Sequence, residues 1–139
     1  MQILLRYEIV DHTADVAVRV FGNTYEELLA NSVYAAADLF YDTANLYPVS
    51  STIVDVEGHS VEDVFVEALS RVIYLFETTS VLYFGCDVLY LKEGWSASLE
   101  LSGSPLPEGA EVRYALKAPT YHMIEISPEK GYAFLVFDV

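Results

Sequence analysis

The amino-acid sequence predicts an α+β fold: a single compact domain in which two long helices pack on a mostly antiparallel β-sheet of about seven strands. Two segments have apolar residues at helical spacing, and most of the remaining chain has the alternating or continuous apolar pattern of strands. The helices do not alternate with single strands, as they would in a doubly wound parallel sheet. The chain has 139 residues, 53% of them hydrophobic, which is enough for one core, so we assign residues 1–139 to one domain.

A start signal precedes each predicted helix. Thr24 followed by Glu27, and Ser60 followed by Asp63, have the spacing of a capping box, which satisfies free N–H groups of the first helical turn. In the segment after Ser60, apolar residues recur at i, i+3, i+4 and i+7, the strongest periodic pattern in the chain. We therefore expect the two helices to begin at these caps.

The other apolar segments are predicted to be strands. Trp95 to Ser102 alternates apolar and polar residues, which is typical of a strand with one exposed face. Tyr132 to Phe137 has no polar interruption, so we expect a central strand that is buried on both faces. The further strand candidates are Tyr7 to Val10, Val16 to Phe21, Ser51 to Glu57, Val81 to Leu91, Val112 to Lys117, Tyr121 to Ser127 and, continuing the last segment, residues up to Asp138.

The chain is strongly acidic. It has 21 Asp and Glu residues against seven Lys and Arg residues, a formal net charge of −14, and no two basic residues are adjacent. Binding to nucleic acid depends on clustered Lys and Arg that neutralise phosphates, so we expect no direct nucleic-acid binding. A positively charged protein or a cation is the more natural ligand, unless the acidity serves only solubility.

Neither a membrane span nor a secretion signal is apparent in the sequence. No apolar run approaches the roughly 18 residues that a transmembrane helix needs. The segment from Met1 to Arg6 lacks the charged start and the small-residue cleavage site of a signal peptide. The single cysteine, Cys86, excludes an internal disulfide. We therefore expect a cytoplasmic protein that does not associate with a membrane.

Acidic residues near both ends of the chain could bind a metal ion. Asp11 and Asp15 flank a turn after the first predicted strand, and Asp138 precedes Val139, whose α-carboxylate would be a second acidic group there. If the first and last strands are neighbours, Asp15 completes a cluster of the oxygen ligands that Ca²⁺ and Mg²⁺ prefer. The alternative is that Asp11 and Asp15 cap turns and that Asp138 is solvated.

The histidines and the cysteine give weaker indications of chemistry. His12 could ligate a metal or act as a base, or simply bond the backbone, and His122 could pair with Glu125 or Asp15. The chain has no pair of cysteines, which disfavours a zinc site. Cys86 follows a glycine in a predicted strand and is better explained as a core residue than as a nucleophile. No phosphate-binding glycine loop and no nucleophile elbow is present.

Four segments, in order along the whole chain, resemble the archease family. They are Asp11-His12-Thr13-Ala14-Asp15 with the Gly22-to-Leu28 segment after it, Tyr74-Leu75-Phe76-Glu77, Lys117-Ala118-Pro119-Thr120-Tyr121-His122, and the terminal Phe137-Asp138-Val139. The chain departs from the family pattern at Ser70-Arg71, where archeases often have Asn-Glu, and at Pro119, which replaces an aliphatic residue.

The resemblance implies both a function and a site. Archeases are accessory proteins of the RtcB-type RNA ligase of tRNA splicing and RNA repair; they promote guanylylation of the ligase and its multiple turnover, and are not ligases themselves. The resemblance implies a divalent cation, Ca²⁺ in the family with Mg²⁺ or Mn²⁺ as alternatives, bound by Asp15, Asp138 and Val139. It also implies that Lys117 acts in ligase activation.

Two other functions are compatible with the residues alone. One is a metal-dependent hydrolase that uses Asp11, His12 and Asp15, which needs a base near a bound water and an enclosed pocket. The other is a generic chaperone-like binding module, which predicts several partners of similar affinity and no effect on guanylylation. A phosphoesterase screen with Mn²⁺ tests the first, and the range of bound partners tests the second.

Overall fold

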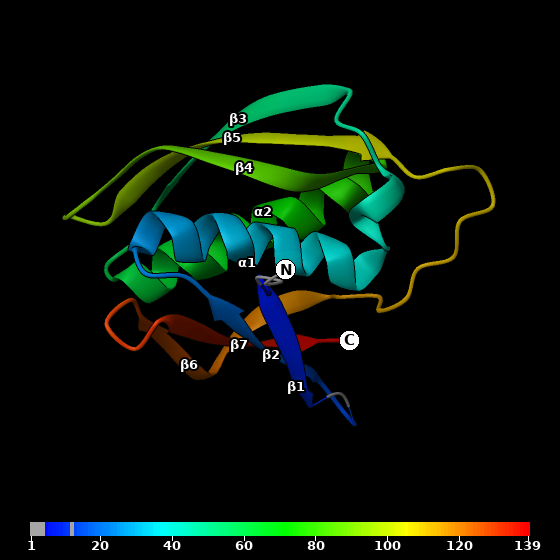
Figure 1. Ribbon diagram of the computed structural model, residues 1–139. Helices are drawn as coiled ribbons and strands as arrows, with labels where there is room; N and C mark the ends of the chain where they lie inside the picture. Colours follow the sequence, from blue (N-terminus) through cyan, green and yellow to red (C-terminus); the bar gives the residue numbers. More distant parts are fainter. Residues whose placement is uncertain (1–4, 12) are drawn as a thin grey trace, which may run out of the picture.

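Two helices lie between two antiparallel β-sheets in this computed structural model, which describes residues 5–11 and 13–139 (Figure 1). His12, a candidate ligand and base, lies outside the described residues. The four-stranded sheet has the order β1-β2-β7-β6 and the three-stranded sheet the order β3-β5-β4. The four strands of the first sheet are β1 (Tyr7–Asp11), β2 (Val16–Phe21), β7 (Tyr132–Asp138) and β6 (Ala118–Ser127). Those of the second are β3 (Ser50–Glu57), β5 (Ser96–Pro105) and β4 (Val81–Lys92).

The predicted helix starts are confirmed. Helix α1 (Tyr25–Phe40) begins after Thr24, whose hydroxyl accepts a hydrogen bond from the Glu27 N–H at 3.0 Å. Helix α2 (Val61–Thr79) begins after Ser60, whose hydroxyl accepts from the Asp63 N–H at 3.2 Å. A short 3₁₀ helix, η1 (Thr43–Asn45), follows α1 and was not predicted.

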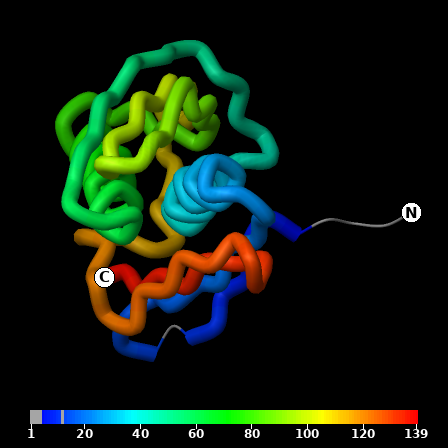
Figure 2. Tube along the Cα trace, turned by 90° about the vertical axis from the view of Figure 1, so that its left-hand side faces the viewer, coloured from blue at the N-terminus to red at the C-terminus, as the bar shows by residue number. Residues whose placement is uncertain are grey.

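The α+β class, the two helices and the seven strands are confirmed, but the strands form two sheets instead of one. Helix α1 explains why, because Leu28, Leu29 and Ala37, which span about half of its circumference, are all fully buried. One sheet can cover only one stripe of a helix, so burial over this much of its surface needs a layer on each side. Figure 2, turned by 90° from Figure 1, shows the helices as the middle layer.

The prediction of a strand at Val112–Lys117 is wrong. This segment belongs to the long connection from β5 to β6, which crosses from one sheet to the other (Figure 1). The N–H groups of Arg113 and Tyr114 donate to the carbonyls of Phe40 and Leu39, at 2.7 and 3.0 Å. The last carbonyls of a helix have no partner within it, so this segment caps the end of α1 instead of pairing with a sheet.

The prediction that Tyr132–Phe137 is central and buried on both faces is correct in part. Strand β7 is paired on both edges, with β2 and β6, and its helix-facing side chains Ala133, Leu135 and Phe137 are fully or almost fully buried. On the other face, Phe134 is only partly buried. Val136, on the same outer face, is almost fully buried, so this face of β7 is covered at one position and open at another.

The outer face of the four-stranded sheet therefore faces away from the helices. Arg19 makes an ion pair with Glu8 at 2.7 Å across β1 and β2, and Lys130 makes one with Glu125 at 2.8 Å. Tyr132 donates its hydroxyl hydrogen to the same Glu125, at 2.8 Å. Within the described part of the chain, no helix is long and apolar enough to cross a membrane.

Candidate functional site

Residues from both ends of the chain meet at one end of the four-stranded sheet. Strands β2 and β7 are antiparallel neighbours, with Ala17 opposite Val136. Asp15 lies in the bend just before β2, and continuing the register by one residue beyond Val16 and Phe137 would bring it opposite Asp138, on the face of Ala17 and Val136. Side chains directly opposite in an antiparallel pair have Cβ atoms about 5 Å apart. The first and last strands, β1 and β7, are therefore not neighbours as the prediction required; β2, which follows Asp15, lies between them and pairs with β7.

Lys117 lies at the same place. Its main-chain N–H donates to the carbonyl oxygen of Asp138 at 2.8 Å, and the next residue, Ala118, begins the pairing of β6 with β7 opposite Asp138. The buried side chain of Leu116 anchors the segment, and Lys117 itself is exposed. We call Asp15, Lys117, Asp138 and Val139 the strand-end site. The contact of Lys117 with Asp138 is observed, and the position of Asp15 follows from the register of β2 and β7. The roles that the resemblance implies for these residues stay predictions.

The donor groups of the strand-end site suit a hard cation. If the extended register brings the carboxylates of Asp15 and Asp138 together, they would repel each other, and a cation between them would offset this repulsion. Hard divalent cations take oxygen ligands from carboxylates, main-chain groups and water together. Among residues 5–11 and 13–139, no group of three or more His, Cys, Asp or Glu side chains is placed to hold a metal ion. A cation here would therefore need main-chain, water or partner oxygens beside Asp15 and Asp138.

A hollow of about 290 Å³ adjoins this site on the outer face of the sheet. Its floor consists of Ala17, Phe134 and Val136 from β2 and β7. We call it the outer hollow. Its rim is formed by Val10, Asp11, Thr13, Ala14 and Asp15 on one side and by His122 and Met123 on the other. Asp15 thus belongs to both the outer hollow and the strand-end site.

An irregularity in β6 builds one wall of the outer hollow. Thr120 is opposite Val136 and Glu125 is opposite Phe134, so β6 advances five residues while β7 advances two. The three extra residues form a wide bulge, in which Met123 has a φ of +54°. This left-handed conformation is unfavourable for a residue with a side chain, and such strain is concentrated at functional sites.

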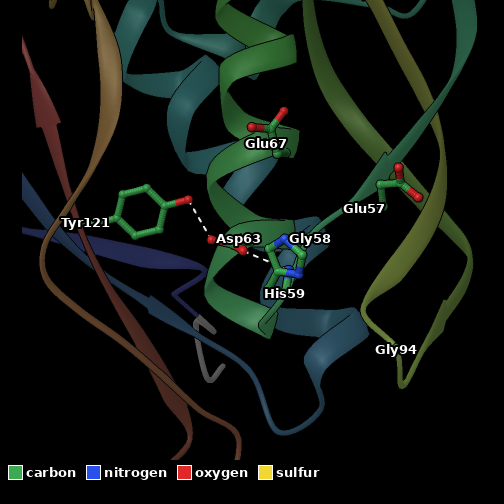
Figure 3. A pocket seen from close by; sticks show the side chains of 7 residues that line it. All are labelled: Glu57, Gly58, His59, Asp63, Glu67, Gly94 and Tyr121. Atoms are coloured by element: carbon green, nitrogen blue, oxygen red, sulfur yellow. Dashed lines mark hydrogen bonds between the residues drawn. The ribbon is translucent and has the colours of Figure 1, made fainter.

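A second hollow, the acidic pocket of about 580 Å³, lies by the start of α2 (Figure 3). It is lined by Glu57, Gly58, His59, Asp63, Glu67, Gly94 and Tyr121. The Asp63 carboxylate accepts hydrogen bonds from the His59 main-chain N–H at 2.8 Å and from the Tyr121 hydroxyl at 2.7 Å. The His59 N–H and then the Tyr121 hydroxyl lower the pKa of Asp63, while the carboxylate raises the pKa of Tyr121 to about 12. Asp63 thus ties the β6 bulge to the helix start.

This link predicts a pH-dependent effect of Tyr121→Phe. Because the pKa of Asp63 is lower in the folded than in the unfolded chain, its contribution to stability is present above the unfolded value of about 3.9 and is lost as the pH falls through the folded value. We expect Tyr121→Phe to lower the midpoint of urea unfolding at pH 7, with a difference from the native chain that narrows below about pH 4. A difference that stays constant from pH 7 to pH 2 would contradict this account. Tyr74→Phe, which also removes an exposed hydroxyl, is the control.

The remaining candidate residues are placed as follows. The side chain of Asp11 accepts hydrogen bonds from the N–H and the hydroxyl of Thr13, both at 3.1 Å, so it does cap the turn. His122 lies in the outer hollow with Asp15, whereas Glu125 is bonded to Lys130 and Tyr132 instead. Cys86 packs against the core, and burial raises the pKa of its thiol to about 12, so it is a poor nucleophile at neutral pH.

Sequence reasoning missed the outer hollow, the β6 bulge and the contact of Tyr121 with Asp63. The sequence predicts Tyr121–Ser127 as a regular strand, and it contains no pattern that indicates a bulge of three residues relative to β7. The only hint for Asp63 was its place in the first turn of the helix, which explains its capping but not its partner on β6.

Comparison with known proteins agrees with the resemblance. The model of the Archease protein family (MTH1598/TM1083) matches residues 7–139. The chain is 41% identical to the protein archease of Thermoplasma acidophilum over 135 residues, covering 97% of this chain and 94% of that protein. It is 40% identical over 135 residues to the protein archease of Thermoplasma volcanium, covering 97% of this chain and 100% of that protein.

Two solved structures have the same fold. The solution structure of Methanobacterium thermoautotrophicum protein 1598 superposes with a TM-score of 0.76 at 22% identity, covering 96% of this chain and 99% of that chain. The crystal structure of a Thermotoga maritima archease, described as a possible chaperone, gives a TM-score of 0.60 at 22% identity, covering 99% and 100%. The family match over nearly the whole chain and the two relatives at 40% identity or more lead to one conclusion: this chain belongs to the archease family.

Proposed function

We propose that this protein activates an RtcB-type RNA ligase of tRNA splicing without being an enzyme itself, by promoting guanylylation and multiple turnover of the ligase. One observation supports this more than any other: Lys117, Asp138 and Asp15, far apart in the sequence, meet at one exposed sheet end. Family membership supports the type of partner. We propose that it works in the cytoplasm.

The charge of the chain is compatible with this role. A protein with a net charge of −14 would be repelled by RNA, but it would be attracted to a positively charged ligase that binds RNA. Complementary charges speed the encounter and fix the orientation of two proteins. The activator would therefore act on the ligase and would not contact the RNA directly.

We propose that Asp15, Asp138 and Val139 hold a divalent cation, Ca²⁺ in the first instance and Mg²⁺ or Mn²⁺ as alternatives. Such a cation supplies positive charge that stabilises phosphate oxygens. The carboxylates keep it at the exposed end of the sheet, where it could reach toward the nucleotide site of the ligase. The exposed ammonium of Lys117 would face the same phosphates.

Lys117→Ala tests the proposed role of the lysine. We expect the guanylate attached to the ligase in a fixed time with GTP and metal to fall at least about tenfold when this variant replaces the native chain, since one charged hydrogen bond to phosphate contributes about 1.5–3 kcal/mol. The variant should keep its fold, because the contact of Lys117 with Asp138 is made by the main chain. Lys92→Ala, which removes another lysine, is the control. Equal guanylylation by both variants would exclude Lys117 from activation.

The hydrolase alternative has less support. Asp11 is engaged with Thr13, and the hollow that Asp11 and Asp15 border has an apolar floor. A hydrolase would instead need a polar cavity around an activated water. Hydrolysis of a phosphoester in a screen with Mn²⁺, lost on Asp15→Ala, would favour it over the activator.

A further inference from the structure

Two exposed apolar side chains line the outer hollow from opposite edge strands of the sheet. Met123 on β6 is 68% exposed and Val10 on β1 is 46% exposed, and both line the rim. Between them, the floor residues Ala17 and Val136 are almost fully buried, at 8% and 5% exposure. Exposed apolar side chains around an apolar floor favour binding of a partner, because covering them removes apolar surface from water.

The side of the hollow at Met123 is formed by a strained part of the backbone. With regular pairing of β6 and β7, Thr120 would be followed two residues later by the partner of Phe134. The bulge inserts three additional residues before Glu125, and one of them, Met123, has a left-handed backbone conformation. A strained bulge that raises an exposed methionine over an apolar floor has no evident use in the core. Methionine is flexible and polarizable, which suits a surface that adapts to a partner.

The size and the charge of the rim define what fits. A volume of about 290 Å³ is at the lower limit for small-molecule sites, and is enough for one large apolar side chain of a protein. Asp11 and Asp15 border the hollow, and the whole chain carries a charge of −14. Lys or Arg residues beside the inserted side chain would therefore be attracted to the rim.

The outer hollow is continuous with the strand-end site through Asp15. A partner that contacts Asp15 at the strand-end site therefore also lies beside the hollow. Another copy of this chain is a poorer occupant, because two chains of charge −14 repel each other.

We propose that the outer hollow is the anchoring pocket for the RNA ligase: it takes one apolar side chain that is flanked by Lys or Arg on the ligase surface. This inference rests on the proposed function. Anchoring of this kind supplies affinity, because an apolar side chain in a central pocket dominates the energy of many interfaces. The strand-end site supplies activation. The two roles predict different effects for mutations at the two places.

Met123→Gln tests the pocket by calorimetric titration of the full-length protein into an RtcB-type ligase from the same organism. Glutamine has nearly the shape of methionine but carries an amide that would be buried without a partner. We expect the Kd to rise about tenfold. At saturating concentrations of the variant, guanylylation should be the same as with the native chain. Leu89→Gln is the matched control, because Leu89 is similarly exposed, at 54%, on the other sheet.

Met123→Gly separates docking from folding. Glycine adopts a φ of +54° without strain, so the melting temperature should be equal to or above that of the native chain. The Kd for the ligase should nevertheless rise as it does for Met123→Gln, while Met123→Leu should bind within about twofold of the native chain.

The outcomes distinguish this inference from the proposed function. A native chain that activates the ligase, with all Met123 variants binding as tightly, would overturn the pocket and leave the activator role intact. A native chain that neither binds nor activates the ligase would overturn both. Concentration-dependent dimers that are lost in Met123→Gln would assign the hollow to a second copy and would also overturn the proposal.

Discussion

Replacement of Asp138 with alanine is expected to lower the affinity of the protein for Ca²⁺ by at least about tenfold and to abolish activation of the ligase. Asp138 is exposed at the end of β7, and the β2–β7 register places Asp15 opposite it. Removal of one of two opposed carboxylates leaves too little negative charge to hold a divalent cation. Titration calorimetry with Ca²⁺ measures the first effect, and the count of ligations per ligase measures the second.

The same substitution should change stability with opposite signs in the two metal states. With a chelator present, Asp138→Ala removes the repulsion between the carboxylates, so the variant should be as stable as the native chain or slightly more stable. With Ca²⁺ in excess, the native chain gains more stability from binding than the variant, because the gain, RT ln(1 + [L]/Kd), grows as the Kd falls. Asp87→Ala makes the same change of charge at an exposed position of β4, and it should change stability neither with the chelator nor with excess Ca²⁺. Equal Ca²⁺ affinity of Asp138→Ala and the native chain would exclude Asp138 as a ligand.

Phe137→Ala is expected to have the largest effect on folding, with a loss of about 3–5 kcal/mol in the free energy of unfolding. Phe137 is fully buried beneath the helices and directly precedes Asp138. Since a domain of this size is stable by only about 5–15 kcal/mol, the variant would be close to unfolding at physiological temperature. Urea unfolding followed by circular dichroism measures the loss.

Phe134→Ala is the matched control for this prediction. It truncates the same residue type on the same strand, but on the outer face, where Phe134 is only partly buried. We expect a clearly smaller loss than for Phe137→Ala, because less apolar area returns to water. Equal losses at the two positions would contradict the placement of the helices on one face of this sheet. Phe137→Leu keeps most of the volume and serves where the alanine variant does not fold.

The elements with local signals could be predicted from the sequence. The hydroxyl caps at Thr24 and Ser60 act within one turn of the chain, so the starts of both helices follow from the sequence alone. The alternation in β5 places Leu99 and Leu101 toward the helices, as the pattern predicts. Pro119 lies on β6, an edge strand of its sheet, where a missing N–H is tolerated.

The errors concern interactions between distant parts of the chain. The segment with Arg113 has the alternation of a strand, yet its N–H groups bond the end of α1, and its guanidinium contacts Asp38. Which strands share a sheet depends on how much of each helix must be covered, and periodicity does not give this. The β6 bulge and the contact of Tyr121 with Asp63 likewise arise only when β6 meets α2.

The candidate site lies between these cases. Asp15 and Asp138 could be singled out by residue type and by resemblance, and the pairing of β2 with β7 makes them neighbours. The proximity of Lys117 follows from the hydrogen bond of its N–H to Asp138, which joins the β5–β6 connection to the end of the chain. The outer hollow had no signal in the sequence, because Val10 and Met123 are apolar residues of two edge strands that only the folded sheet brings together.

The most direct test of the activator role is a turnover assay. The native protein is mixed with the RtcB-type ligase of the same organism, GTP, divalent metal and an RNA with ligatable ends, and ligations per ligase molecule are counted with and without it. We predict multiple turnover only when the protein is present. A single ligation per ligase in both mixtures, with unchanged guanylate on the ligase, would contradict the account.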